Sequence, residues 1–156
     1  MMSPKPNAKH IMPEITPFLW FDGQAGEAAK FYTSIFKHSK IKSISPMSAS
    51  FRLKGQDFLA LNGGPRFKFN EAVSFFVSCK TQKEIDYYWK KLSAGGEESR
   101  CGWLKDKFGL SWQIIPSILG DLIDGKDAAK SQRALQAMPE MRKLDLQKLK
   151  DAYAGK

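Results

Sequence analysis

The side chains that most often do chemistry in proteins are scarce in this sequence. Its histidines are His10, near the N-terminus, and His38, within a Lys-His-Ser-Lys turn, and its cysteines are Cys79 and Cys101. Neither cysteine has a neighbour at metal-ligand spacing, and no predicted histidine or helix N-terminus lies beside Cys101 to activate its thiol. We therefore expect free, inert thiols and little capacity for general-base or thiol catalysis.

Residues suited to binding are better represented, beginning with one amide. The segment 110–115, Leu-Ser-Trp-Gln-Ile-Ile, is a predicted strand that puts Ser111, Gln113 and Ile115 on one face. Gln113 is thus a polar amide on a face that is otherwise small or apolar. The commoner role of such a residue is a buried amide that hydrogen-bonds within the protein, and a ligand contact is the alternative. Only the second role predicts loss of binding on mutation.

Four aromatic side chains on predicted strands are further candidates for a binding site. They are Trp20, Phe75, Trp103 and Trp112. Aromatic side chains on strands usually pack in the core. A concave sheet lined by aromatic side chains and a few amides is also typical of a small-molecule pocket, so the sequence leaves both roles open.

The composition is that of an ordinary globular protein of one domain. The 156 residues are 42% hydrophobic and 26% charged, with a formal net charge of +9. The lysines are scattered and do not interleave with aromatic residues, so we expect a solvated basic surface and no nucleic-acid partner. No apolar run is long enough to span a bilayer and residues 1–10 lack the apolar core of a secretory signal. We expect no membrane partner and a cytoplasmic location.

Two blocks with the same order of elements position the candidate residues. The first block has a predicted strand at 15–22, a helix at 24–36 with apolar residues at helical spacing, and strands at 40–45, 48–53 and 56–62. The order is thus a strand, a helix and three strands. The second block repeats this order over fewer residues.

The second block begins with a predicted strand at 72–79. Thr81 and Glu84 have the spacing of a capping box and open a helix that closes at Gly95-Gly96. A hairpin follows, with Leu104-Lys105 on one side, residues 110–115 on the other, and Gly109 supplying the positive φ of the turn. The repeated order predicts an internal structural repeat.

The two ends of the chain lie outside this repeat. We expect residues 1–14 to be a flexible leader. Residues 117–156 form a C-terminal extension of the same domain, with predicted helices at 117–123, 131–138 and 145–153. We expect these helices to cover a sheet edge or a second subunit.

Three motifs add a family resemblance to this pattern. Ile15-Thr-Pro-Phe-Leu-Trp-Phe-Asp-Gly23, Cys101-Gly-Trp-Leu-Lys-Asp-Lys-Phe-Gly-Leu-Ser-Trp-Gln-Ile-Ile-Pro116 and the tail Arg133-Ala-Leu-Gln-Ala-Met138 resemble the PhnB-like branch of the vicinal oxygen chelate superfamily. The resemblance implies an α+β fold of two βαβββ modules, residues 15–65 and 70–116. Their sheets would form a glyoxalase-like open barrel, which a homodimer usually completes.

The resemblance also implies where a metal ion would bind. Metal-dependent relatives, such as glyoxalase I, extradiol dioxygenases and fosfomycin-resistance proteins, hold a divalent ion with His, Glu or Gln. No His or carboxylate stands at the matching positions, and amide oxygens alone are poor ligands for zinc or iron. We expect no metal and no cofactor, and we keep Asn62 and Gln113 as candidate ligand contacts. The matching positions are about Thr16 or Pro17, Val73 or Ser74, Asn62 and Gln113.

The leading hypothesis is therefore a protein that binds an unidentified small organic molecule in its barrel without a catalytic metal. The alternative is a metal-dependent glyoxalase- or dioxygenase-like enzyme with an unconventional ligand set, such as Gln113 with a residue from another chain.

Members of this branch often carry a 3-demethylubiquinone methyltransferase label. The sequence lacks the Gly-rich turn between a strand and a helix that a Rossmann-type cofactor site needs, since Asn62-Gly-Gly-Pro65 leads into a loop. We do not adopt the label.

Overall fold

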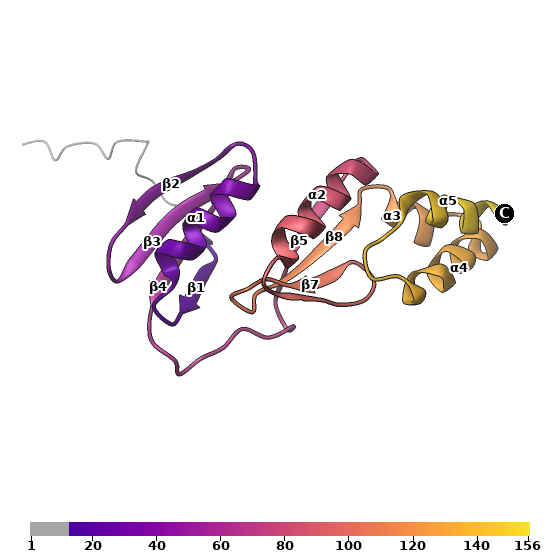
Figure 1. The fold of residues 1–156 in the computed structure, drawn as a ribbon. Coiled ribbons are helices and arrows are strands. Elements are labelled where there is room, and N and C mark those ends of the chain that lie inside the picture. The colour runs from indigo at the N-terminus through magenta and orange to yellow at the C-terminus, as the bar shows by residue number, and fades with distance from the viewer. Residues whose placement is uncertain (1–12) are drawn as a thin grey trace, which may run out of the picture. The chain divides into compact units, whose positions relative to one another are not determined.

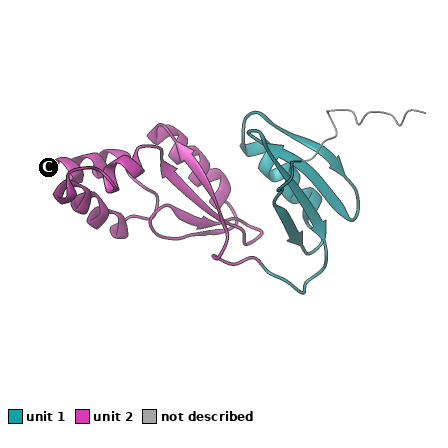
Figure 2. Cartoon of the chain, turned by 180° about the vertical axis from the view of Figure 1, so that it is seen from behind, with its two compact units in different colours: residues 1–68 teal, residues 69–156 magenta. Residues whose placement is uncertain are grey.

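The computed structural model describes residues 13–156, and the chain divides into two compact units at Lys68 and Phe69 (Figure 2). Unit 1 ends at Lys68, and unit 2 runs from Phe69 to Lys156. Each unit contains one four-stranded mixed sheet, with one helix in unit 1 and several in unit 2, which confirms the predicted α+β fold class. Of the predicted leader, residues 1–12 lie outside the described residues. Within residues 13–156, no helix is long and apolar enough to cross a membrane.

Unit 1 follows the predicted order of strand, helix and three strands (Figure 1). Its sheet has the order β1-β4-β3-β2, in which β1 runs parallel to β4 and the other neighbours are antiparallel. Strands β3 and β4 have the predicted bounds. The pairing of β2 with β3 shifts its register between Ile41 and Ser43, as at a β-bulge. The elements are β1 (Phe18–Phe21), α1 (Ala25–Ile35), β2 (Ser39–Ile44), β3 (Ser48–Leu53) and β4 (Gln56–Asn62).

Helix α1 covers one face of the unit 1 sheet and forms its core. Tyr32 of α1 is buried with its ring centroid 5.9 Å from that of Phe51, which in turn stacks on Phe58 at 5.2 Å. The opposite face carries Phe18, which is 59% exposed, and Trp20, because alternate side chains of β1 point away from α1. This face of unit 1 is therefore free of helices of its own unit.

Unit 2 repeats the order of elements and adds the C-terminal helices. Its sheet has the order β5-β8-β7-β6, with β5 parallel to β8. Strand β5 begins at Ser74, two residues later than predicted, and Val73 is 63% exposed. The two-residue strand β6 was not predicted, because two adjacent glutamates carry no strand pattern. The elements before the extension are β5 (Ser74–Cys79), α2 (Gln82–Ser93), β6 (Glu97–Glu98), β7 (Trp103–Lys105) and β8 (Ser111–Pro116).

The register of unit 2 decides which side chains share a face. Phe76 pairs with Gln113, and Gln113 pairs with Trp103, so these three side chains lie on one face in a row across three strands. Phe75 and Trp112 pair on the other face, which packs on α2. We call the face that carries Ser74, Phe76, Trp103, Lys105, Ser111 and Gln113 the open face of unit 2.

The predicted capping box begins α2 as expected. The Thr81 hydroxyl accepts a hydrogen bond from the backbone N–H of Glu84 at 3.2 Å, and the Glu84 carboxylate accepts one from the backbone N–H of Lys80 at 2.9 Å. The Glu84 N–H is one of the donors that the first turn of a helix cannot satisfy internally, and the Lys80 N–H lies just before the N-cap residue Thr81. The start of α2 is thus fixed by a local sequence signal.

The C-terminal extension packs on its own unit, at the end of β8. Ile115, Leu119, Leu144 and Leu149 form a buried cluster that joins the sheet to the helices. Helix α4 begins three residues before the predicted start, because the Asp127 side chain accepts a hydrogen bond from Lys130 N at 3.1 Å and caps it. The extension contains α3 (Leu119–Ile123), α4 (Ala128–Ala137), a 3-10 turn (Met138–Glu140) and α5 (Leu146–Ala154).

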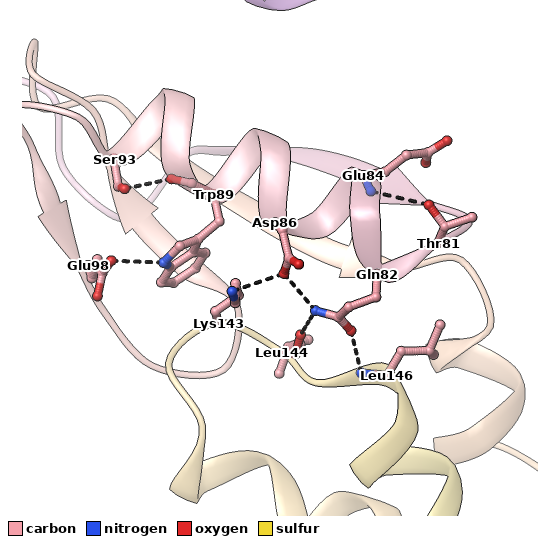
Figure 3. A network of polar contacts seen from close by, with 10 residues as sticks. All are labelled: Thr81, Gln82, Glu84, Asp86, Trp89, Ser93, Glu98, Lys143, Leu144 and Leu146. Carbon is pink, nitrogen blue, oxygen red and sulfur yellow. Dashed lines mark hydrogen bonds and ion pairs between the residues drawn. The ribbon is translucent and has the colours of Figure 1, made fainter.

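A polar network ties this extension to α2 (Figure 3). The Gln82 amide nitrogen donates to the carbonyl oxygen of Leu144 at 3.1 Å, and its oxygen accepts from the backbone N–H of Leu146 at 2.8 Å. Lys143 forms an ion pair with Asp86 at 2.9 Å, and Asp86 also accepts from Gln82. Gln82 therefore hydrogen-bonds to the backbone just before α5 and at its first residue.

Candidate functional site

The row Phe76, Gln113 and Trp103 is where the structure brings two predicted site residues together. Gln113 and Trp103 are half-buried neighbours on β8 and β7, and Phe76 on β5 is 61% exposed. The Gln113 amide nitrogen donates a hydrogen bond to the Ser74 hydroxyl at 2.9 Å. An amide flanked by two accessible aromatic rings can hydrogen-bond a ligand through its oxygen while the rings contact apolar parts of the ligand.

Two other predicted residues, Phe75 and Trp112, lie on the opposite face of the same sheet. Their rings meet edge to face with centroids 5.4 Å apart, and Trp112 is only 3% exposed. The Trp112 indole N–H donates to the Asp106 carboxylate at 2.9 Å. Asp106 also accepts from the backbone of the hairpin turn, at Phe108 and Leu110. These contacts give Phe75 and Trp112 a packing role beneath α2.

In unit 1, Trp20 packs against the segment that follows β4. Its indole N–H donates to the carbonyl oxygen of Gly64 at 2.9 Å, and its ring meets Phe67 edge to face at 5.0 Å. A Cβ at Gly63 would lie 2.3 Å from the Trp20 ring, so only glycine fits there. Half of Trp20 is thereby covered by its own unit.

Both the oxygen and the nitrogen of the Asn62 side-chain amide form hydrogen bonds within unit 1. Its oxygen accepts from the backbone N–H of Ala25 at 2.8 Å and its nitrogen donates to the carbonyl oxygen of Pro46 at 3.0 Å. Gln24, the residue that precedes α1, supplies no side-chain cap, so Asn62 satisfies the helix N-terminus from a distant strand. Its predicted role as a ligand contact stays a prediction.

Sequence reasoning missed a cavity of about 500 Å³ at the β6–β7 edge of unit 2. Trp103 is the one predicted site residue in its lining, and the others include Glu71, Glu97, Lys105 and Ser111. The Ser111 hydroxyl is buried and has no hydrogen-bond partner among the described residues. Alternation along β7 and β8 could have placed Lys105 and Ser111 beside Trp103 and Gln113, but Glu97 lies on a strand with no sequence signal.

Unit 1 carries a buried carboxylate, Asp57, on the face opposite α1. Arg52 holds it with two hydrogen bonds of 2.7 and 3.1 Å, and Lys42 approaches to 2.8 Å. The hydrogen bonds from Arg52 lower the pKa of Asp57 to about 2, although burial acts in the opposite direction. Asp57 is therefore ionised and neutralised, which makes it a structural ion pair and a poor general base.

The superfamily raises the question of a divalent metal ion, and the side chains present do not fit one. Ser74 and Gln113, at the positions matched to metal ligands in the second module, are neutral and hydrogen-bond to each other. Imidazole, thiolate and carboxylate groups are the ligands that zinc and iron favour. Within residues 13–156, no group of three or more His, Cys, Asp or Glu side chains could hold a metal ion.

Comparison with known proteins gives the family. Residues 13–115 match the family described as 3-demethylubiquinone-9 3-methyltransferase. A PhnB protein from Bacillus cereus, described as a candidate member of that family, is 36% identical, and the match covers 67% of this chain and 99% of that chain with a TM-score of 0.63. The chain belongs to this family. A comparison with curated proteins gives no match.

More distant structures share the fold of this PhnB-like family. Protein PA1353 from Pseudomonas aeruginosa is 18% identical over 67% of this chain and 98% of that one, with a TM-score of 0.55. The fosfomycin-resistance protein FosX from Listeria monocytogenes, solved with Mn(II) and sulfate, is 14% identical over 65% of this chain and 87% of that one, with a TM-score of 0.50. These two likenesses extend the shared fold to a fosfomycin-resistance protein, as the sequence motifs predicted.

Proposed function

We propose that this PhnB-like protein binds a small organic molecule on the open face of unit 2, without a catalytic metal. The observation that carries the proposal is the row of Phe76, Gln113 and Trp103, because it offers one amide between two accessible rings. A few convergent polar groups among aromatic side chains are typical of small-molecule sites.

Pairing of the two sheets into a barrel and assembly into a homodimer stay predictions. Sedimentation equilibrium tests the second of these.

The methyltransferase description of the family is not part of the proposal. Rossmann-type methyl transfer needs a parallel sheet with a Gly-rich turn that cradles the cofactor between a strand and a helix. Here the turn from β5 to α2 is Lys80-Thr81, which contains no glycine, and each sheet has a single parallel pair. The fold supports binding better than this chemistry.

The test is a thermal-shift screen against small metabolites, followed by calorimetric titration of any compound that stabilises the protein. We expect Gln113→Ala and Trp103→Ala each to weaken binding by roughly tenfold or more, since each removes a contact worth about 1.5 kcal/mol. Tyr87→Ala is the matched control, because Tyr87 is an exposed aromatic of the same unit on α2, away from the open face. A screen without a single binder, or variants that bind as the parent does, would contradict the proposal.

A further inference from the structure

The cavity at the β6–β7 edge differs in composition from the rest of the open face. Its lining contains Trp103 but neither Gln113 nor Phe76, and all of its residues belong to unit 2. Its volume of about 500 Å³ lies in the range of small-molecule pockets. The proposed function does not say which kind of molecule would enter it, and the charges in the lining address that question.

Carboxylates dominate the lining although the chain as a whole is strongly basic. Three glutamates, Glu71, Glu97 and Glu98, face two cations, Lys105 and Arg100, in a protein with a formal net charge of +9. Glu71 and Lys105 form an ion pair at 2.5 Å and neutralise each other. Glu98 accepts a hydrogen bond from the neutral indole N–H of Trp89 at 2.9 Å, so its negative charge is not cancelled (Figure 3).

Glu97 is the carboxylate that remains open to a ligand. It is exposed, and no side chain within residues 13–156 hydrogen-bonds or forms an ion pair with its carboxylate. It stands opposite Lys105 in the β6–β7 register, and Lys105, which forms its ion pair with Glu71, also attracts Glu97 at longer range. A positively charged group that enters the cavity would therefore meet a carboxylate that forms no contact ion pair within residues 13–156.

Two neutral groups in the same lining complement a protonated amine. The half-buried indole of Trp103 offers a π-face that attracts cations. Ser111 is 1% exposed and its hydroxyl has no hydrogen-bond partner within residues 13–156, which is an unfavourable state for a buried polar atom unless a ligand or a water molecule supplies one. A hydroxyl oxygen accepts from an N–H, and an N–H is what a primary ammonium group brings.

The wall of the cavity beside these groups is held by the C-terminal extension. The backbone N–H of Cys101 donates to the carbonyl oxygen of Met141 at 2.9 Å, and that of Gly102 donates to the carbonyl oxygen of Arg142 at 2.8 Å. Cys101 has a φ of 57°, a left-handed conformation that a non-glycine residue rarely adopts unless its surroundings hold it. A wall fixed in advance lowers the ordering cost of binding.

We propose that the β6–β7 cavity of unit 2 binds a small primary amine with an apolar body. The ammonium group lies between Glu97 and the Ser111 hydroxyl, and the apolar body lies against Trp103. Quaternary amines fit less well, because they have no N–H for Ser111. The cavity shares Trp103 with the row of the proposed function but contains neither Gln113 nor Phe76, so the inference adds a second site to that function.

Calorimetric titration with three probes of the same shape tests the charge preference. Phenethylamine is cationic at neutral pH, phenethyl alcohol is neutral and hydrocinnamate is anionic. We expect the amine to bind at least tenfold more tightly than either of the others. Equal binding of the amine and the alcohol, or no heat with the amine at millimolar concentration, overturns the inference. The proposed function is tested separately, by the wider metabolite screen and by the effects of Gln113→Ala and Trp103→Ala on the compounds that it finds.

Variants of the full-length chain locate the bound amine. Glu97→Gln is expected to weaken amine binding roughly tenfold and to affect the neutral alcohol much less, and Ser111→Ala is expected to weaken amine binding several-fold. Glu140→Gln is the matched control, since Glu140 is an exposed carboxylate of the extension outside the cavity. If Glu97→Gln and Glu140→Gln weaken amine binding equally, the effect comes from the net charge of the protein, and the proposed site is wrong. Loss with Gln113→Ala but not with Glu97→Gln would move the ligand to the open-face row and also overturn it.

Discussion

At the scale of single residues, Asn62 shows how a candidate ligand contact can have a structural task. Its amide caps α1 from β4 and links to the carbonyl oxygen of Pro46. We predict that Asn62→Ala lowers the free energy of unfolding by about 1–2 kcal/mol, the cost of losing a helix cap and a second hydrogen bond. Urea denaturation measures it. Asn62→Asp keeps the acceptor for Ala25 and should recover part of the loss; an unchanged stability of Asn62→Ala would show that the cap contributes nothing.

The second residue-scale prediction concerns the pH dependence given by Asp57. The hydrogen bonds from Arg52 lower the pKa of Asp57 from 3.8 to about 2, so ionised Asp57 stabilises the folded state above about pH 4. This contribution is lost as the pH falls through the folded value near 2. With Arg52 partly exposed to solvent, we expect Asp57→Asn to cost roughly 2 kcal/mol at neutral pH.

The test is the difference in unfolding free energy between the parent and Asp57→Asn, measured in urea from neutral pH down to about pH 2. The difference should shrink between about pH 4 and pH 2, where the parent carboxylate becomes protonated. Asp22→Asn is the control, because Asp22 is exposed in the same unit and forms no ion pair within residues 13–156. A constant difference over this range would contradict the assigned role of the ion pair.

At the scale of elements, two glycines in unit 2 with the same backbone conformation should differ in their tolerance of a side chain. Gly102 and Gly109 have φ of 83° and 86°. A Cβ at Gly109 meets nothing within 4 Å, whereas one at Gly102 lies 2.8 Å from the carbonyl oxygen of Ile114 and 3.2 Å from Leu144. The first substitution brings backbone strain alone, and the second brings strain and a clash with both the sheet and the extension.

We predict that Gly109→Ala lowers the free energy of unfolding by about 1 kcal/mol and Gly102→Ala by more than about 3 kcal/mol. Denaturation followed by circular dichroism measures both. Hydrogen exchange at Cys101 and Gly102 adds a local measure, because their amides bond to the extension. Equal costs for the two variants would mean that the extension does not pack on the β6–β7 turn as described.

The elements also show which features a single sequence can predict. The capping box of Thr81 and Glu84, the strands β3 and β4 and the glycine turn at Gly109 were predicted because their signals lie within a few residues. The roles of Asn62 and of the cavity residues depend on partners far along the chain or on a strand of two residues. Alternation predicted that Gln113 and Trp112 would face opposite ways, but not which face α2 would cover.

At the scale of the whole molecule, the family match and the structure divide the chain differently. The match ends at residue 115, yet the extension is part of unit 2, since Leu144 and Leu149 share a core with Ile115. The match to the B. cereus relative covers 67% of this chain and 99% of that one, so about a third of this chain has no counterpart there. The extension lies beyond the family match and holds one wall of the β6–β7 cavity.

The net charge of +9 leads to the last prediction, which separates general electrostatics from recognition of nucleic acid. The basic and aromatic segment Arg66-Phe67-Lys68 would be the natural place for a base to stack, but Phe67 packs against Trp20 and lies beneath Arg66 at 5.2 Å. We predict that single-stranded DNA and heparin are both retained weakly in filter binding at about 50 mM salt and released at about 200 mM. Phe67→Ala should leave DNA retention unchanged. Retention of DNA but not heparin at the higher salt, lost with Phe67→Ala, would instead establish base stacking and a nucleic-acid partner.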